Sequence, residues 1–155
     1  MQPPHDHPER IELAMESHPR HIAAIRKNVE NFCALHGLSE MAVAEVGLCL
    51  NEALANIIRH AYEGATDKPI AITAEIADGE LLLSIRDWGN GVDPTLRPPP
   101  PYDPLTPGGL GLICLKRLTD DVRYTPQPDG MLLTIRKRKT VDSSTPGADS
   151  TKAQT

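Results

Sequence analysis

Two helical stretches that follow one another without an intervening strand constrain the fold of this chain most. Apolar residues recur at helical spacing over residues 22–33 and stop before Gly37, and a second stretch covers residues 39–62 with Ser39 as its N-cap. Strict alternation of strands and helices is missing, which disfavours a doubly wound nucleotide-binding fold. Patterns of period two predict strands at 10–16, 70–76, 81–86, 122–124 and 131–137, and a third helix begins near Leu110.

The predicted strands are grouped into hairpins. Asp78-Gly79 and Pro128-Asp129-Gly130 supply turn residues between neighbouring strands. Hairpins beside helices predict an α+β two-layer sandwich, with the helices packed on one face of a mixed β-sheet. The 155 residues suffice for one domain, which we place at residues 9–137. Segments 1–8 and 138–155 are polar and rich in Pro or in small residues, so we expect them to be disordered.

Charge and composition exclude several classes of function. The formal net charge is −5 and no run of Lys or Arg forms an electrostatic footprint for a nucleic-acid backbone, so we expect no direct binding of nucleic acid. No signal-peptide pattern occurs, and no apolar stretch approaches the roughly 18 residues of a membrane span. Cys33, Cys49 and Cys114 lie in apolar helical patterns, which indicates small core residues in a reducing compartment. We therefore expect a cytoplasmic protein that does not bind membranes.

The second helical stretch carries three polar residues on one ridge. Glu52, Asn56 and His60 are spaced i, i+4 and i+8, and Glu52 and Asn56 fall outside the apolar stripe of the helix. Such a ridge can form one wall of a polar site. It is equally typical of the solvated face of an amphipathic helix, and this segment alone leaves both interpretations open.

Two glycine-containing segments follow. Asp87-Trp88-Gly89-Asn90-Gly91 ends a predicted strand, and Pro107-Gly108-Gly109-Leu110-Gly111-Leu112 precedes a predicted helix. Glycines before a helix let main-chain N–H groups approach an anion, which the helix dipole also favours. Taken singly, the first segment is also typical of a plain turn and the second of a flexible hinge.

In this order and at these spacings, the three segments resemble the GHKL superfamily, whose ATP-binding domain has the Bergerat fold. Glu-x-x-x-Asn matches its N box, Asp-x-Gly-x-Gly its G1 box and Gly-Gly-Leu-Gly-Leu its G2 box. The closer resemblance is to anti-sigma factor serine kinases, through Glu52-Ala-Leu-Ala-Asn56-Ile-Ile-Arg-His60-Ala-Tyr62. The resemblance extends over residues 9–137, most of the chain.

The resemblance implies that the cofactors are ATP and Mg2+. Asn56 would hold the metal, and Asp87 would accept a hydrogen bond from the adenine amino group. Main-chain N–H groups of the G2 box would bind the phosphates. Thr134 matches a family threonine near the adenine, although an ordinary strand threonine fits the position as well. The full set of residues implied in nucleotide binding is Asn56, His60, Asp87, Gly89, Gly91, Gly109, Leu110, Gly111, Leu112 and Thr134.

Glu52 decides between a kinase and a protein that only binds ATP. A carboxylate one turn before the metal-binding residue can accept the proton of a serine hydroxyl beside the γ-phosphate. Related ATPases use a similar glutamate to activate water, so the residue alone does not name the acceptor.

The resemblance describes a protein serine kinase that is also an anti-sigma factor. Such a protein phosphorylates a serine of an anti-anti-sigma protein with a STAS domain, sequesters a sigma factor, and forms a homodimer. One alternative is a switch kinase that phosphorylates a STAS scaffold and activates a phosphatase. Another is a non-catalytic regulator that binds ATP and acts by docking.

Two further segments correspond to parts of the family. Residues 92–107, which contain seven prolines, correspond to the ATP lid. Arg26 matches a position at which the family contacts partner proteins, although an ordinary surface arginine fits this position equally.

Overall fold

The structure is a computed structural model and describes residues 9–94 and 111–139. Several sequence predictions lie outside this range, namely the disorder of 1–8 and of the tail beyond Lys139, most of the lid, and the positions of Gly109 and Leu110. Arg138, which we assigned to the tail, belongs to the last strand. Its N–H donates to the Asp120 carboxylate over 2.7 Å, so the ordered domain extends at least one residue beyond the expected limit.

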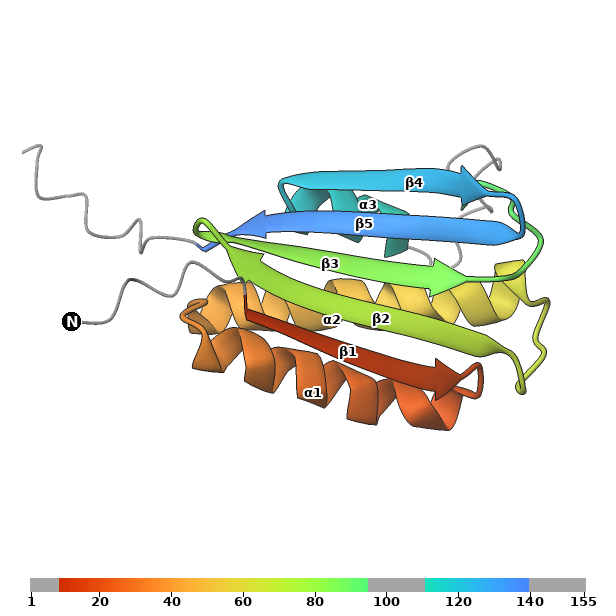
Figure 1. Cartoon of the computed structure of the whole chain (residues 1–155), viewed down its shortest axis with the longest axis horizontal. Coiled ribbons are helices and arrows are strands. Elements are labelled where there is room, and N and C mark those ends of the chain that lie inside the picture. Colours follow the sequence, from red (N-terminus) through yellow and green to blue (C-terminus); the bar gives the residue numbers. More distant parts are fainter. Residues whose placement is uncertain (1–8, 95–110, 140–155) are drawn as a thin grey trace, which may run out of the picture.

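Five strands form one sheet in the order β1 (Glu9–Glu16), β2 (Pro69–Ala77), β3 (Glu80–Asp87), β5 (Gly130–Arg138) and β4 (Asp121–Gln127). All neighbouring strands are antiparallel. The prediction of a mixed sheet is therefore wrong for the part of the chain that is described. β4 runs in the same direction as β3, but β5 lies between them because β4 and β5 form a hairpin whose second strand pairs with β3 (Figure 1).

The helices α1 (Ile22–Leu35), α2 (Glu40–Asn56) and α3 (Gly111–Leu118) lie on one face of this sheet (Figure 1). A 3-10 turn at Pro19–His21 leads into α1, and α2 packs against both α1 and α3. The predicted α+β two-layer sandwich is confirmed.

Local signals set the start of α2 and the end of α1. The Ser39 hydroxyl accepts a hydrogen bond from the N–H of Ala42 over 3.1 Å, as expected of an N-cap. Gly37 has a φ of +94°, a conformation that costs a glycine little, and the chain turns there from α1 toward α2.

Helices and sheet meet in one hydrophobic core. Alternate residues of the strands face the helices, and those of β3 are at most 3% exposed. Cys33 and Cys49 are buried, which confirms their predicted place in the core, and burial raises the pKa of Cys33 to about 12. The most deeply buried side chains of the core include Val29, Val46, Leu50, Leu54, Ile70, Ile72, Leu81, Leu83, Ile85, Leu115 and Ile135.

The second helix does not end as an α-helix. After Asn56, residues Ile57–Ala61 form a π-helical turn, in which the N–H of Tyr62 donates to the carbonyl oxygen of Ile57 over 3.0 Å. The predicted helix over 39–62 is right in extent but wrong in its last turn. A π-helical turn holds more residues than an α-helical one, so the ridge of Glu52 and Asn56 does not continue unchanged to His60.

Glu40–Ala61 is long and apolar enough to span a membrane by length and composition, with a mean hydropathy of 1.4. Our expectation that no such stretch exists is therefore wrong. Half of its apolar window is buried inside the fold. Core helices of soluble proteins pass the same test, and contacts with the sheet, α1 and α3 account for this composition.

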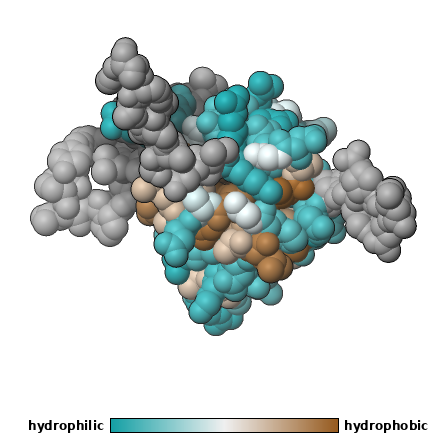
Figure 2. All heavy atoms as spheres, turned by 90° about the vertical axis from the view of Figure 1, so that its left-hand side faces the viewer, coloured by the Kyte–Doolittle hydropathy of each residue, from teal (hydrophilic) through white to brown (hydrophobic). Residues whose placement is uncertain are grey.

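The end of the molecule where α1 leads into α2 is remote from the C-terminal end of α2. Its surface is mostly hydrophilic, with hydrophobic patches between the hydrophilic regions (Figure 2). Leu35 at the end of α1 and Met41 at the start of α2 are 79% and 73% exposed. The N box and G1 box lie at the opposite end, where α2 and β3 both finish.

Candidate functional site

A cavity opens where α2 and β3 end, between the helix layer and the sheet. Its empty space is about 450 Å³ when the open solvent at its mouth is counted, and the room for water-sized molecules within it is much smaller. Four residues predicted for nucleotide binding line it together, namely Asn56, His60, Asp87 and Gly91. The remaining lining residues among those described are Ala53, Ile57, Ala61, Val92, Pro94, Tyr124, Met131 and Leu133, so most of the lining is apolar.

Asp87 is the buried carboxylate of this cavity. It is the last residue of β3 and only 3% exposed. Its Oδ1 accepts a hydrogen bond from the N–H of Gly89 over 2.9 Å. Burial raises the pKa of Asp87, while the Gly89 N–H and the positive charge of Arg86 act in the opposite direction. Asp87 is thus an acceptor fixed at the wall of a cavity.

The G1 box packs directly on the π-helical turn. The Asn90 side chain donates to the carbonyl oxygen of His60 over 2.9 Å, and the Asn90 N–H donates to that of Ala61 over 3.1 Å. Gly89 lies against the same main chain, with no space for a side chain. Gly91 has a φ of +72°, so it too is a position that favours glycine. These contacts join the N box and the G1 box into one wall.

Glu52 lies one helical turn before Asn56 and does not line the cavity itself. Its Oε2 atom is buried and has no hydrogen-bond partner within the described ranges. Buried polar atoms are nearly always satisfied in folded proteins, so we expect this oxygen to be bound by water, an ion, a ligand or a substrate. The interpretation of Glu52 as part of a merely solvated helix face does not account for this burial.

Asn56 is the polar side chain of α2 that faces the cavity. Within residues 9–94 and 111–139, no group of three or more His, Cys, Asp or Glu side chains is placed to hold a metal ion. An amide oxygen together with phosphate oxygens and water suits Mg2+, which prefers oxygen ligands and needs few from protein. The residues present therefore fit a metal that is held mainly by a nucleotide.

Thr134 requires a correction. Residues alternate across β5, and Met131 and Leu133 line the cavity. Thr134 pairs with Ser84 of β3 and points to the other face of the sheet. The prediction that Thr134 lies at the adenine is therefore wrong for this arrangement.

The G2 box is described only in part. Gly111 and Leu112 begin α3. Gly109 and Leu110 lie outside the described residues. That the main-chain N–H groups of this segment bind phosphates stays a prediction.

Sequence reasoning missed the wall that β4 and β5 supply. Tyr124 of β4 lines the cavity, and burial, together with the negative charge of Asp93, raises its pKa to about 12. Met131 is paired with Asp87 in the sheet. The sequence offered one signal for this wall, the aromatic residue Tyr124 in the short predicted strand 122–124. The pairing of β5 with β3, which brings β4 and β5 to the cavity, is not visible in the sequence.

Arg26 of α1 lies beside the N box rather than free at the surface. Its guanidinium donates to Oδ1 of Asn51 over 3.1 Å and lies 3.8 Å from the Glu30 carboxylate. Its side chain remains 39% exposed. Arg26 therefore joins α1 to the residue next to Glu52.

Comparisons with known proteins agree with this site. A family model described as the histidine kinase-like ATPase domain matches residues 15–137. The chain is 27% identical over 123 residues to the serine-protein kinase RsbW of Listeria monocytogenes serovar 1/2a, covering 74% of this chain and 78% of that protein. It is 26% identical over 121 residues to the RsbW of Bacillus subtilis, covering 73% and 76%.

Two solved structures share the fold. The structure of the RsbU and RsbW domains of Rv1364c from Mycobacterium tuberculosis matches with a TM-score of 0.63 at 19% identity, over 84% of this chain and 32% of that one. The histidine kinase domain of a blue-light activated kinase from Erythrobacter litoralis matches with a TM-score of 0.52 at 14% identity, over 78% and 60%. This chain thus spans less than two thirds of each solved chain.

The family model covers the N box and the G1 box, which the structure brings together at one cavity, and it continues to the end of β5. The predicted resemblance to ATP-dependent serine kinases is confirmed by the relatives that share this region. The chain belongs to the histidine kinase-like ATPase family.

Proposed function

We propose that this protein is an ATP-dependent protein serine kinase that acts on a STAS-type anti-anti-sigma protein and also binds a sigma factor. The observation that carries the proposal is the buried, unpartnered Oε2 of Glu52, one turn before Asn56. A serine hydroxyl beside the γ-phosphate would satisfy this oxygen, as a water molecule would in a related ATPase. The names of the related kinases support the same activity.

In the proposed site, ATP enters the cavity with its base toward Asp87. The Asp87 carboxylate accepts a hydrogen bond from the adenine amino group, and the apolar walls from α2 and β5 cover the ring. Asn56 would hold Mg2+, which supplies positive charge to the phosphate oxygens. His60, which also lines the cavity, would contact the nucleotide.

Glu52 is the proposed general base. Its carboxylate takes the proton from a serine Oγ of the protein substrate, the Oγ forms a bond to the γ-phosphorus, and the bond from that phosphorus to the β–γ bridging oxygen breaks. The products are ADP and phosphoserine. Phosphoryl transfer needs positioning and charge stabilisation more than covalent help, so one carboxylate and one metal site suffice.

The proposed partners follow from the same family. A sigma factor would bind the ATP-loaded protein, and phosphorylation of the anti-anti-sigma protein would remove its antagonist. Arg26, exposed beside Asn51, is available for contacts with either partner. We also propose that the protein forms a homodimer, functions in the cytoplasm, and binds neither DNA nor membranes directly.

The test is single-turnover phosphate transfer from labelled ATP to a STAS protein. Glu52→Ala should lower the rate by about 10²–10⁴-fold, the usual contribution of a general base, with ATP affinity nearly unchanged. Glu40→Ala, at an exposed acidic residue of the same helix, is the matched control and should transfer phosphate like the wild type. Equal rates for Glu52→Ala and the wild type would exclude Glu52 as the base and favour a regulator that acts by docking alone.

Asn56→Ala separates binding from chemistry. It should abolish the difference in ATP affinity between buffers with and without Mg2+, measured by calorimetry. Wild-type dependence on Mg2+ in this variant would contradict the assigned metal position.

A further inference from the structure

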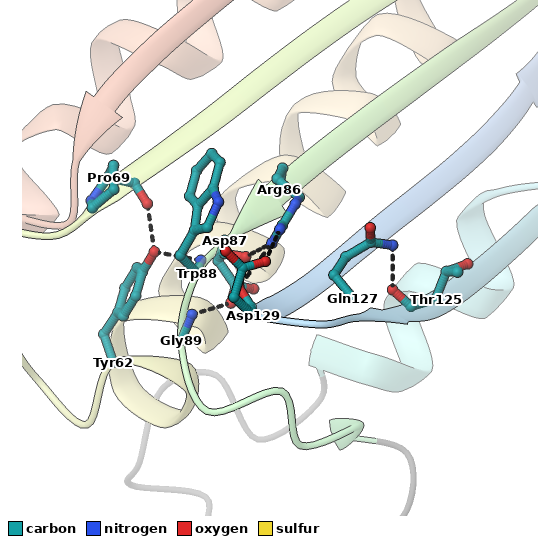
Figure 3. Close-up of polar contacts among 9 residues, drawn as sticks. All are labelled: Tyr62, Pro69, Arg86, Asp87, Trp88, Gly89, Thr125, Gln127 and Asp129. Carbon is teal, nitrogen blue, oxygen red and sulfur yellow. Dashed lines mark hydrogen bonds and ion pairs between the residues drawn. The ribbon is translucent and has the colours of Figure 1, made fainter.

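Tyr62 ends the N box motif, and nothing in the proposed chemistry uses it. The residue is 8% exposed, and its hydroxyl makes two hydrogen bonds. It donates to the carbonyl oxygen of Pro69 over 2.5 Å and accepts from the N–H of Trp88 over 2.8 Å. Figure 3 shows the hydroxyl between these two partners, with the rings of Tyr62 and Trp88 extending in opposite directions.

The second of these bonds ends on the peptide group that follows Asp87. The N–H of that peptide group is the N–H of Trp88, and it donates to the Tyr62 hydroxyl. Its carbonyl oxygen, that of Asp87, accepts from the Arg86 guanidinium. Arg86 is itself held by the Asp129 carboxylate over 2.7 Å. The peptide group between Asp87 and Trp88 is therefore fixed at both ends (Figure 3).

A peptide group held in this way fixes the residues on either side of it. The Asp87 side chain leaves the main chain directly before this peptide, and Gly89, which donates to the Asp87 carboxylate, comes directly after Trp88. Rotation of this peptide would change the path of the chain from Asp87 to Gly89 and so weaken the bond between the Gly89 N–H and the Asp87 carboxylate. The Tyr62 hydroxyl opposes that rotation, because the Trp88 N–H would lose its hydrogen bond to Tyr62, a residue that is only 8% exposed.

We infer that Tyr62 is a positioning residue for base recognition, which orients Asp87 through the Trp88 N–H. The inference rests on the proposed role of Asp87 in accepting from adenine. It names a function for the last residue of the N box: Tyr62 acts on the selectivity for adenine and takes no part in phosphoryl transfer.

The experiment compares the affinities of Tyr62→Phe for ATP and GTP by calorimetry. Phenylalanine keeps the buried ring and removes only the hydroxyl. We expect ATP to bind at least fivefold more weakly and GTP to change less than twofold, because guanine has no amino group at the position read by Asp87. The ATP-to-GTP preference should therefore fall at least fivefold, and the rate of phosphate transfer at saturating ATP should stay the same.

Ser17→Ala is the matched control. Ser17 is also a fully buried hydroxyl with two main-chain bonds, to the carbonyl oxygen of Ala65 and from the N–H of Lys68. It stabilises the same connection before β2 but does not reach the G1 box. It should lower the unfolding temperature without changing the preference for ATP. Equal loss of preference in both variants would mean that Tyr62 is only structural, and would overturn the inference.

A double-mutant cycle with Asp87→Asn tests the route of action. If Tyr62 acts through Asp87, adding Tyr62→Phe to Asp87→Asn should not lower the preference further. Additive losses would overturn the inference. Absence of any ATP preference in the wild type would instead overturn the role of Asp87, and with it the proposed site.

One measurement does not depend on a variant that folds. Amide hydrogen exchange of Trp88 in the wild type should be slow, and ATP should slow it at least tenfold further by closing the site around the G1 box. Exchange of the Trp88 amide at the rate of an exposed amide would overturn the inference even if Tyr62→Phe does not fold.

Discussion

A Cβ atom built on Gly89 would lie 2.4 Å from the carbonyl oxygen of Ala61 and 2.8 Å from its Cβ. The G1 box and the π-helical turn therefore touch through main-chain atoms. The N–H of the next residue, Asn90, donates to the same carbonyl oxygen. Only a glycine allows this approach, so the residue is required for packing as much as for contact with a nucleotide.

Gly89→Ala should therefore destabilise the protein by about 1–3 kcal/mol, since backbone must shift to admit the methyl group. ATP affinity should fall as well, because the shift moves the Gly89 N–H away from Asp87. Urea unfolding and calorimetry measure the two effects.

Gly47→Ala is the control for this prediction. The atoms nearest to a Cβ there belong to the end of the Glu30 side chain, which is flexible and can move aside. Inside a helix, alanine is favoured over glycine by up to about 1 kcal/mol, so this variant should be neutral or stabilised. Equal destabilisation of both variants would show that the contact with Ala61 is not the cause.

ATP binding should weaken at acidic pH through Asp87. Burial raises the pKa of this carboxyl, so it becomes protonated at a higher pH than an ordinary aspartate. Affinity should be constant near neutral pH and fall as pH falls through the raised pKa, because the ionised acceptor is lost. Asp87→Asn should weaken binding near neutral pH by about 1–3 kcal/mol and abolish this step.

Loss of stability cannot produce the same profile through this group. A carboxyl with a raised pKa binds its proton more tightly in the folded state than in the unfolded state, so its protonation stabilises the fold as pH falls. Thermal unfolding over the same pH range is the control. An acidic step in affinity that persists in Asp87→Asn would assign the titration to another group.

The ion pair of Lys137 and Glu45 joins β5 to α2. The Lys137 side chain is 8% exposed, lies 3.1 Å from the Glu45 carboxylate, and donates to the carbonyl oxygen of Leu118 over 2.6 Å. Lys137→Met should cost about 3 kcal/mol, because it leaves a partly buried carboxylate without a partner. The double variant Glu45→Leu, Lys137→Met should be less destabilised than the sum of the single variants in urea unfolding.

Features set by nearby residues could be predicted from the sequence. The Ser39 cap, the end of α1 at Gly37 and the hairpin turn at Asp78-Gly79 were all confirmed. Each depends on one or two residues whose preferred backbone conformation decides the outcome, and Asp78 and Gly79 both have positive φ values. No distant contact is needed to specify them.

Features set by pairing between distant strands could not be predicted. The face on which Thr134 lies depends on which residue of β5 pairs with Asp87, and that residue is Met131. A shift of one residue would have placed Thr134 in the cavity, since side chains alternate. The fully antiparallel sheet has the same origin, because the sequence does not show that β5 joins β3.

The site was predictable where a helix or turn carries it. The spacing of Glu52 and Asn56 placed them one turn apart on α2, but it did not show that Oε2 of Glu52 is buried. The π-helical turn also escaped prediction, because its residues have ordinary helical preferences. Its wide turn meets the main chain at Gly89 and Asn90, and that contact exists only after β3 has formed.

The position of β5 has a consequence during synthesis. β5 is the last strand of the described chain to be made, yet it lies inside the sheet between β3 and β4. Until it has left the ribosome, β3 has an unpaired edge, of the kind that promotes aggregation. Met131 and Leu133 belong to β5, so the cavity wall that they form is complete only after β5 has been synthesised. A nascent chain that ends before β5 therefore lacks this wall of the cavity and exposes the edge of β3.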